Sequence, residues 1–234
     1  MGVSAALDPQ TAQKKAAAER AVEWVRSGMT VGLGTGSTAI WAIRGIGAAL
    51  ADGSLRDVVC IPTSEVSAAA ARELDIPLVT FDDRTVIDLT IDGADEVDPA
   101  LDLVKGYGGA LLREKVVAQA TRRQVIVVDA SKPSPRLGTR CHVPVEVIRF
   151  AWRAEREHLQ ALGAQVVLRS VGADPFLTDE GNWILDADFG PIDDVPRLAA
   201  LLQARAGIVE HGLFVGLTHD LLIAGPDGVE HRTL

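Results

Sequence analysis

The chain has 234 residues and a formal net charge of −9, and 47% of its residues are hydrophobic. This composition favours a folded chain of one or two domains over a disordered one. The acidic balance and the lack of a long basic run argue against a nucleic-acid binder. No hydrophobic run reaches the ~18 residues of a membrane span and the first residues show no signal-peptide pattern, so we expect a cytoplasmic protein without a membrane partner. The two cysteines, Cys60 and Cys141, form no C-x-x-C pair, which fits a reducing compartment.

Helical and strand patterns alternate along the first part of the chain, up to Asp129. Pro9 suits the first turn of a helix, and Gly28 would end that helix. The predicted helices cover 9–27, 37–50, 65–74 and 109–122, and the predicted strands cover 30–33, 58–61, 77–80, 86–92 and 124–129. This alternation is typical of an α/β fold with a Rossmann-like, mostly parallel sheet flanked by helices. Ligands of such sheets bind at the carboxyl ends of the strands, where we expect Gly34, Asp92 and Asp129 to lie together.

The chain changes in character after Lys132, where several prolines interrupt it. Strands are predicted over 143–147, 166–170 and 183–187, and helices over 152–162 and 195–204. Their order indicates a second, smaller α+β domain of the ferredoxin-like kind over residues 133–206, which we expect to take part in oligomer contacts. Residues 207–234 carry strand patterns at 212–216 and 221–224 and would rejoin residues 1–132 in an α/β catalytic domain.

Residues 32–39, GLGTGSTA, lead from a predicted strand into a predicted helix through small residues. Glycines let backbone N–H groups approach an anion, and the start of a helix adds partial positive charge. Thr35, Ser37 and Thr38 add hydroxyl groups, so the segment suits a phosphate. The alternative is a tight strand-to-helix turn that merely needs glycine. Lys14, in the first helix, is another phosphate candidate, and a solvated lysine is its alternative.

Two nucleotide-binding motifs fit the same segment less well. A P-loop ends in Gly-Lys-Ser/Thr, which is missing here. A dinucleotide fingerprint is formally met from Gly34 to Ala39 in its looser form, with alanine last. However, neither Asp52 nor Asp57 clearly ends a second strand, as the acidic residue of that fingerprint should.

The segment from Asp92 to Lys115 gathers groups that could move a proton within a small anionic substrate. Asp92 and Asp95 follow a hydrophobic strand, and because close acids repel, one of them can hold its proton more tightly. Lys105 precedes a glycine-rich turn whose N–H groups could meet a developing oxyanion. Glu114 follows about one turn into the next helix.

These side chains also have plainer interpretations. A carboxylate pair suits a divalent metal, but Lys105 supplies positive charge without one and no histidine joins the cluster. Glu114 could be an ordinary surface glutamate, and Asp95 a turn or cap residue. Lys132, three residues after Asp129, could be a solvated loop lysine.

At these residues the chain closely resembles the type A ribose-5-phosphate isomerase family. The matching motifs, in the family's order and approximate spacing, are GLGTGSTA at 32–39, IPTS at 61–64, DGADEVD at 92–98, KGYGGALLREK at 105–115, DASK at 129–132, PVEV at 144–147 and GLF at 212–214. They span nearly the whole chain, and several motifs in series are far more specific than any one of them. The main departure is Tyr107, where many members have glycine.

The resemblance implies a set of site residues. Glu114 would be the proton acceptor, with Asp92, Asp95 and Lys105 as further catalytic residues. The substrate contacts would be Lys14, Thr35, Gly36, Ser37, Thr38, Asp92, Gly93, Ala94, Asp95, Lys105, Gly106, Tyr107, Gly108 and Lys132. It also implies a homodimer or homotetramer that needs no metal and no other cofactor.

The activity that the resemblance implies is the interconversion of D-ribose 5-phosphate and D-ribulose 5-phosphate through a cis-enediolate, in the non-oxidative pentose phosphate pathway. Glu114 would move the proton between neighbouring carbons, while Lys105 and the amides of the glycine turn stabilise the oxyanion. Two other classes stay open. A sugar-phosphate sensor would bind the ligand without turnover, and a dinucleotide oxidoreductase would bind a nicotinamide cofactor.

Overall fold

The computed structural model describes residues 7–234 and contains a six-stranded sheet of order β15-β14-β6-β3-β1-β2. Its strands are β1 (Thr30–Leu33), β2 (Val59–Pro62), β3 (Leu89–Asp92), β6 (Gln124–Asp129), β14 (Asp220–Gly225) and β15 (Gly228–Arg232). All neighbours from β14 to β2 pair in parallel, and β15 pairs antiparallel with β14 at one edge. The predicted α/β fold with a mostly parallel sheet is therefore confirmed.

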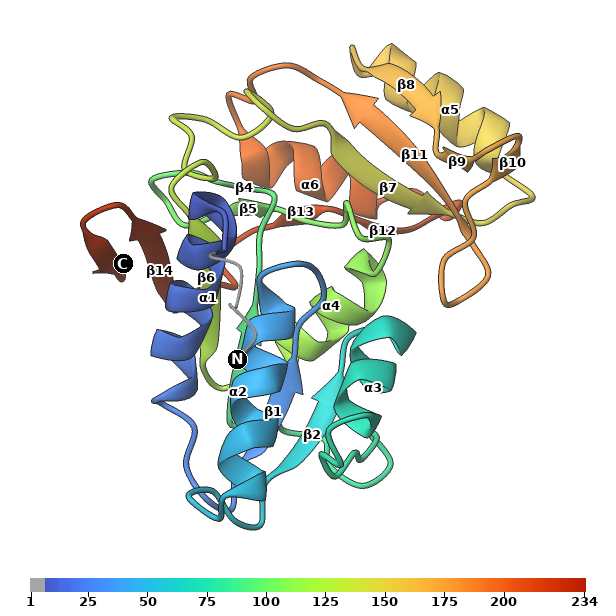
Figure 1. Cartoon of the computed structure of the whole chain (residues 1–234). Helices are drawn as coiled ribbons and strands as arrows, with labels where there is room; N and C mark the ends of the chain where they lie inside the picture. Colours follow the sequence, from blue (N-terminus) through green and yellow to red (C-terminus); the bar gives the residue numbers. More distant parts are fainter. Residues whose placement is uncertain (1–6) are drawn as a thin grey trace.

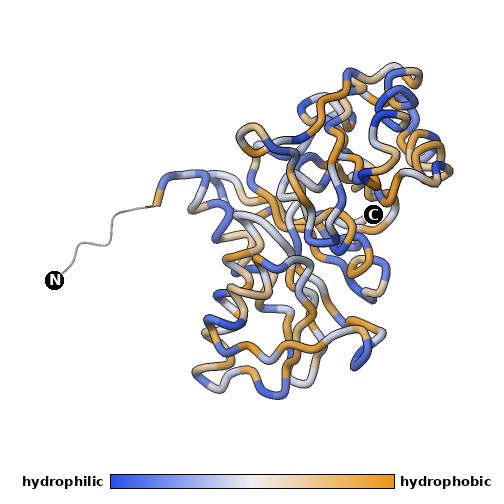
Figure 2. Tube along the Cα trace, turned by 90° about the vertical axis from the view of Figure 1, so that its right-hand side faces the viewer, coloured by the Kyte–Doolittle hydropathy of each residue, from blue (hydrophilic) through white to orange (hydrophobic). Residues whose placement is uncertain are grey.

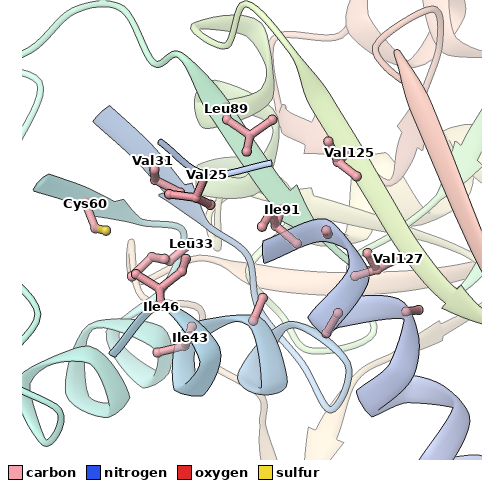
Figure 3. Close-up of a cluster of buried hydrophobic side chains, with 14 of the residues drawn as sticks. Val25, Val31, Leu33, Ile43, Ile46, Cys60, Leu89, Ile91, Val125 and Val127 are labelled. Atoms are coloured by element: carbon pink, nitrogen blue, oxygen red, sulfur yellow. The ribbon is translucent and has the colours of Figure 1, made fainter. Parts of the chain in front are cut away.

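Helices pack on both faces of this sheet (Figure 1). They are α1 (Pro9–Val22), α2 (Ala39–Ala51), α3 (Glu65–Arg72) and α4 (Leu111–Gln119). Side chains alternate between the faces of a strand, so Val127 of β6 joins the cluster under α1 and α2, whereas Ile126 and Val128 pack with Ala118 of α4. Figure 3 shows the first of these clusters, with Ile46 of α2 beneath the strands.

A smaller antiparallel sheet of order β12-β7-β11-β8 lies above the larger sheet in the view of Figure 1. Its elements are β7 (Val143–Val147), α5 (Trp152–Ala161), β8 (Gln165–Leu168), β11 (Trp183–Asp188), α6 (Val195–Gln203) and β12 (Ile208–His211). Leu159 of α5 and Leu202 of α6 pack into one cluster with Val145 of β7, so both helices cover the same face. Hydrophobic segments thus fill the interior of both halves of the molecule (Figure 2).

Strand β13 (Leu213–Phe214) lies within the strand pattern predicted at 212–216, whereas β15 was not predicted. Four shorter strands were not predicted either: β4 (Glu96–Val97) and β5 (Leu103–Val104), in one sheet with β13, and β9 (Ser170–Val171) with β10 (Asp174–Pro175) in another. Each has only two residues, too few for a periodic pattern to show in the sequence. The strand pair β5–β13 fixes the chain just before Lys105.

The end of the smaller domain was predicted at residue 206, but the next strand still belongs to its sheet. Strand β12 pairs antiparallel with β7, with a register shift between Ile208 and Glu210. We therefore propose that the smaller domain covers residues 133–211 and that the larger one consists of residues up to 132 together with those from 212 onward.

Several predicted elements, such as the strand at 86–92 and the helix at 109–122, are shorter in the structure. Two further differences have a clear local cause. The first helix was predicted to reach residue 27 but ends at Val22, and irregular turns follow before Gly28, whose φ of +84° lets the chain reverse into β1. The strand predicted at 77–80 is reduced to a single bridge between Leu78 and Cys60 at the edge of the sheet. Pro77 can only accept in this ladder, through its carbonyl.

Candidate active site

A small cavity opens at the carboxyl ends of β1, β3 and β6. Loops after these strands, the turn after β5 and the first turn of α4 form its wall. The lining residues are Thr35, Gly36, Ser37, Thr38, Gly93, Ala94, Asp95, Lys105, Gly106, Gly108, Glu114 and Lys132. All of these were predicted site residues, and the fold brings them together as expected for a parallel sheet. Lys14, Asp92 and Tyr107 were predicted too but lie outside the lining.

The loop between β1 and α2 presents unbonded N–H groups to the cavity. Helix α2 begins only at Ala39, so Gly36, Ser37 and Thr38 precede it. None of their N–H groups donates to another residue in the described part of the chain. Gly36 has a φ of +107°, which side chains rarely allow. Such N–H groups ahead of a helix form an anion site, so this loop suits a phosphate.

Thr35 is bonded within the protein. Its N–H donates to Oδ1 of Asp92 at 3.1 Å. Its hydroxyl oxygen lies 2.7 Å from Oγ1 of Thr63, 2.8 Å from Oγ of Ser64 and 3.1 Å from Oγ of Ser67. Thr35 therefore holds the phosphate loop, by which we mean residues 34–38, in place, and its hydroxyl is already bonded within the protein.

Lys105 is buried among the acidic groups and is 2% exposed. Its ammonium nitrogen lies 3.0 Å from Oδ2 of Asp92 and 3.2 Å from Oε1 of Glu114. It also donates to the carbonyl of Gly93 at 2.6 Å. Burial alone would lower the pKa of Lys105, but the two carboxylates outweigh burial and raise it. The site thus contains a permanent positive charge that fixes both acids.

Glu114 is a buried carboxyl group on the cavity wall, 5% exposed. Lys105 binds its Oε1, whereas its Oε2 accepts no hydrogen bond from any residue between 7 and 234. Burial raises the pKa of Glu114 to about 8; Lys105 opposes this rise, and Asp92 and Asp95 add to it. An acid of this kind suits general acid–base work near neutral pH. The surface-glutamate interpretation is wrong.

The two aspartates hold different positions. Asp92 is fully buried, and its Oδ1 accepts the N–H groups of Thr35 and Gly93 at 3.1 and 2.7 Å. Burial raises the pKa of Asp92, although Lys105 opposes the rise. Asp95 lines the cavity, and its Oδ2 accepts the N–H of Tyr107 at 3.1 Å. Asp92 therefore holds Lys105 and the loop after β1 from outside the cavity, whereas Asp95 is the aspartate that a ligand in the cavity can reach.

The side chain of Tyr107 turns away from the cavity. Its ring stacks on His142 with centroids 4.7 Å apart, and its hydroxyl accepts the N–H of His142 at 3.1 Å. The tyrosine side chain at this position therefore leaves the cavity open. Lys14 lies in α1, one turn after Gln10, which donates to Oδ2 of Asp129 at 3.5 Å. This face of α1 is thus near the end of β6, next to the cavity wall.

Arg169 was missed by sequence reasoning. Its guanidinium donates to the carbonyls of Gly106 and Tyr107 at 2.8 and 3.1 Å. Arg169 comes from the smaller sheet and belongs to no motif, so no sequence signal marked it.

A larger cavity of about 640 Å³ lies between α3 and α4 but contains none of the predicted site residues. Its walls are mainly hydrophobic, and its Arg113 is already paired with Glu65 and Glu180. The smaller cavity instead contains the buried acid, the ammonium and the N–H groups that have no acceptor among the described residues, which suit proton transfer and anion binding.

Comparison with known proteins agrees with this geometry. The family profile described as ribose 5-phosphate isomerase A (phosphoriboisomerase A) matches residues 59–228. The chain belongs to the ribose-5-phosphate isomerase A family. The ribose-5-phosphate isomerase A of Chloroflexus aurantiacus is 58% identical, with 94% of this chain and 93% of the relative covered. That of Desulfatibacillum aliphaticivorans is 55% identical, with 95% and 97% covered.

Solved structures of the ribose-5-phosphate isomerase family share the whole fold. The enzyme from Plasmodium falciparum is 40% identical, with a TM-score of 0.93 over 96% of this chain and 99% of its own. A D-ribose-5-phosphate isomerase in complex with phospho-erythronic acid is 37% identical, with a TM-score of 0.94 and coverage of 96% and 99%. The chain is accordingly an isomerase that interconverts ribose 5-phosphate and ribulose 5-phosphate, a reaction of the pentose phosphate pathway. Within residues 7–234, no helix is both long and apolar enough to span a bilayer.

Proposed function

We propose that Glu114 performs the proton transfers of this aldose–ketose isomerisation. The observation that supports it is a buried carboxyl on the cavity wall with one oxygen held by Lys105 and the other without a donor among the described residues. In open-chain ribose 5-phosphate, the free oxygen would take the proton from C2, beside the C1 aldehyde. The C2 electron pair would form the C1–C2 double bond as the carbonyl electrons move to O1, giving a cis-enediolate. The same carboxyl would return the proton to C1, leaving the carbonyl at C2.

The negative charge that develops on O1 needs donors near the cavity wall. The ammonium of Lys105 supplies a fixed positive charge, and the N–H of Gly108 faces no acceptor among the described residues. One well-placed oxyanion donor contributes about 10²–10³-fold to turnover. These groups would favour the enediolate over the aldehyde.

The reaction also moves a hydroxyl proton from O2 to O1. We assign this transfer to Asp95, because it lines the cavity while Asp92 is fully buried below it. Asp92 would instead keep Lys105 and the phosphate loop in position through its contacts with Lys105 and Thr35.

The phosphate would bind the N–H groups of Gly36, Ser37 and Thr38, with Lys132 adding charge from the loop after β6. A relative in complex with phospho-erythronic acid supports a phosphate-bearing, open-chain ligand for this site. An anchored phosphate holds the carbon chain so that C1 and C2 stay beside the base.

We further propose that the enzyme acts in the cytoplasm as a homodimer or homotetramer and needs no metal or other cofactor. The family resemblance supports these assignments. Light scattering of the purified chain would measure the oligomeric state.

Glu114→Gln tests the central assignment. It keeps the size of the side chain and removes the base, so kcat should fall at least about 100-fold, while the affinity for inorganic phosphate and the melting temperature change little. Glu73→Gln, at the exposed end of α3, is the matched control and should keep normal turnover. Near-normal turnover of Glu114→Gln would remove this residue from the mechanism.

A further inference from the structure

The guanidinium of Arg169 connects the smaller sheet to the glycine turn of the active site. Arg169 follows β8, and its Nε and Nη2 donate to the two carboxylate oxygens of Asp186 on β11, at 3.0 and 2.5 Å. Its Nη1 donates to the carbonyls of Gly106 and Tyr107, at 2.8 and 3.1 Å. Only 14% of the Arg169 side chain is exposed. The planar guanidinium of an arginine can donate to the carboxylate of Asp186 and to the two carbonyls of the glycine turn at the same time.

Residues 106–109 form a β-turn, closed by the N–H of Gly109 donating to the carbonyl of Gly106 at 3.0 Å. The middle peptide of this turn joins Tyr107 to Gly108. A trans peptide is planar, with its C=O and N–H pointing in opposite directions, and none of the described peptides is cis. Because Arg169 binds the C=O of Tyr107, the N–H of Gly108 points away from Arg169. Gly108 lies on the cavity wall.

This middle peptide has a second orientation open to it. A type II turn reverses the peptide and requires a positive φ at the third residue, which glycine tolerates. Gly108 has no positive φ in the structure, so the turn keeps the type I sense. In the reversed turn the carbonyl of Tyr107 would replace the N–H of Gly108 and repel a developing oxyanion.

Neighbouring contacts hold the turn as a whole. The N–H of Tyr107 donates to Asp95. A Cβ at Gly109 would lie 2.4 Å from the ring of Phe176, so that ring packs directly on the backbone. Arg169 adds the bond to the carbonyl of the peptide that could reverse.

We propose that Arg169 is a positioning residue that keeps the N–H of Gly108 directed at the reacting oxygen of the substrate. This inference deepens the proposed function and rests on it. A residue of the smaller sheet would thereby set the strength of the oxyanion site in the larger one, without touching the substrate.

Arg169→Lys tests the inference. Lysine keeps the charge but cannot bind Asp186 in a fork and both carbonyls together. We expect kcat to fall at least about 10-fold, short of the about 10²–10³-fold of a lost oxyanion donor, with KM and the affinity for inorganic phosphate nearly unchanged. Arg197→Lys is the matched control, because Arg197 is exposed near the start of α6. It should behave as the unaltered enzyme.

Gly108→Ala separates positioning from general damage. A Cβ at Gly108 would meet only Cγ2 of Thr35, at the ordinary distance of 3.5 Å, and alanine disfavours the positive φ of the reversed turn. The kcat loss caused by Arg169→Lys should therefore be several-fold smaller in the Gly108→Ala background than in the unaltered one. A merely structural role predicts the same loss in both backgrounds.

Normal kcat in Arg169→Lys, equal losses in the two backgrounds, or a parallel loss of phosphate affinity would each overturn the inference. Glu114→Gln, measured alongside, separates it from the proposed function. If Glu114→Gln is inactive while Arg169→Lys is normal, only the role of Arg169 fails. If Glu114→Gln stays active, the assignment of the base fails first.

Discussion

Lys105 binds one oxygen of Glu114, 3.2 Å away, and the other oxygen of that carboxyl has no donor in residues 7–234. The ion pair fixes the direction of the carboxyl without using up its basic oxygen. Lys105 also lowers the pKa of Glu114, against the larger effect of burial. The pair therefore sets both the position and the basicity of the proposed base.

The first prediction concerns pH. Glu114 must be ionised to accept a proton, and burial raises its pKa from 4.5 to about 8. We expect kcat/KM to fall as pH drops through this raised value, and to fall at a much higher pH than for an ordinary glutamate. Measuring kcat/KM with ribose 5-phosphate over a series of pH values gives the pH at which this fall, the acidic limb of the profile, occurs.

A substitution that shifts this acidic limb of the kcat/KM profile shows which group produces it. The charge of Asp95 raises the pKa of Glu114, so Asp95→Asn should move the limb to lower pH, whatever its effect on the plateau. A substrate phosphate, with a pKa near ~6, would give a limb that stays in place. An unmoved limb in Asp95→Asn would contradict the assignment to Glu114.

The second prediction concerns the packing of the phosphate loop on Asp92. A Cβ at Gly34 would lie 2.2 Å from Oδ1 and 2.5 Å from Cα of Asp92. Gly34→Ala should therefore displace Asp92 or the loop, decrease the stability by about 1–3 kcal/mol and sharply lower kcat/KM. Denaturant unfolding and steady-state kinetics measure the two effects. Gly225→Ala, where the nearest atom would lie 3.9 Å away, is the control, and an equally mild Gly34→Ala would show that the loop can move freely.

The third prediction concerns the ion pair of Lys115 and Glu210, whose atoms lie 2.6 Å apart and which joins α4 to β12. Both side chains are nearly buried, at 6% and 11% exposure. Lys115→Met leaves Glu210 as an unpaired buried charge, which should cost about 3–5 kcal/mol of stability. Lys115→Met combined with Glu210→Gln should recover part of this loss, because the remaining charge is gone. Thermal and urea unfolding of the unaltered protein and the two variants test the pair; a further loss of stability in the double variant would be the contrary result.

The fourth prediction concerns metals. The ammonium of Lys105 occupies the space between Asp92 and Glu114, at 3.0 and 3.2 Å, where a cation would otherwise bridge the carboxylates. Turnover should therefore be unchanged after dialysis against a strong chelator. Loss of turnover that added Mg²⁺ restores would support the metal alternative instead.

Much of the fold was predictable because contiguous hydrophobic runs define buried strands. Strands β1, β6 and β7 begin and end at the predicted residues. The strand predicted at 77–80 failed because an edge position next to proline offers few ladder bonds, and this depends on neighbours that the sequence does not name. The predicted smaller domain left out β12, because the pairing of β12 with β7, some distance back along the chain, leaves no mark in the sequence.

For the site, the motifs at strand ends were sufficient to predict which residues line the cavity, since parallel strands place their carboxyl ends together. The sequence could not show that the hydroxyl of Thr35 is bound by Thr63 and Ser64, nor that Arg169 binds the glycine turn. Such contacts depend on how separate elements pack. The burial of Glu114, which distinguishes a base from a surface residue, was likewise visible only in the fold.

Strand β6 takes β14 as its neighbour, although about 90 residues separate them, and at about 5–20 residues per second a ribosome needs several seconds to make that stretch. During this interval the hydrophobic edge of β6 has no partner from its own chain, while the whole smaller unit emerges. In this interval the free edge of β6 can pair with strands of other chains. We therefore expect faster folding of the residues between β6 and β14, which brings the C-terminal strands back to that edge, to reduce aggregation of newly made chains.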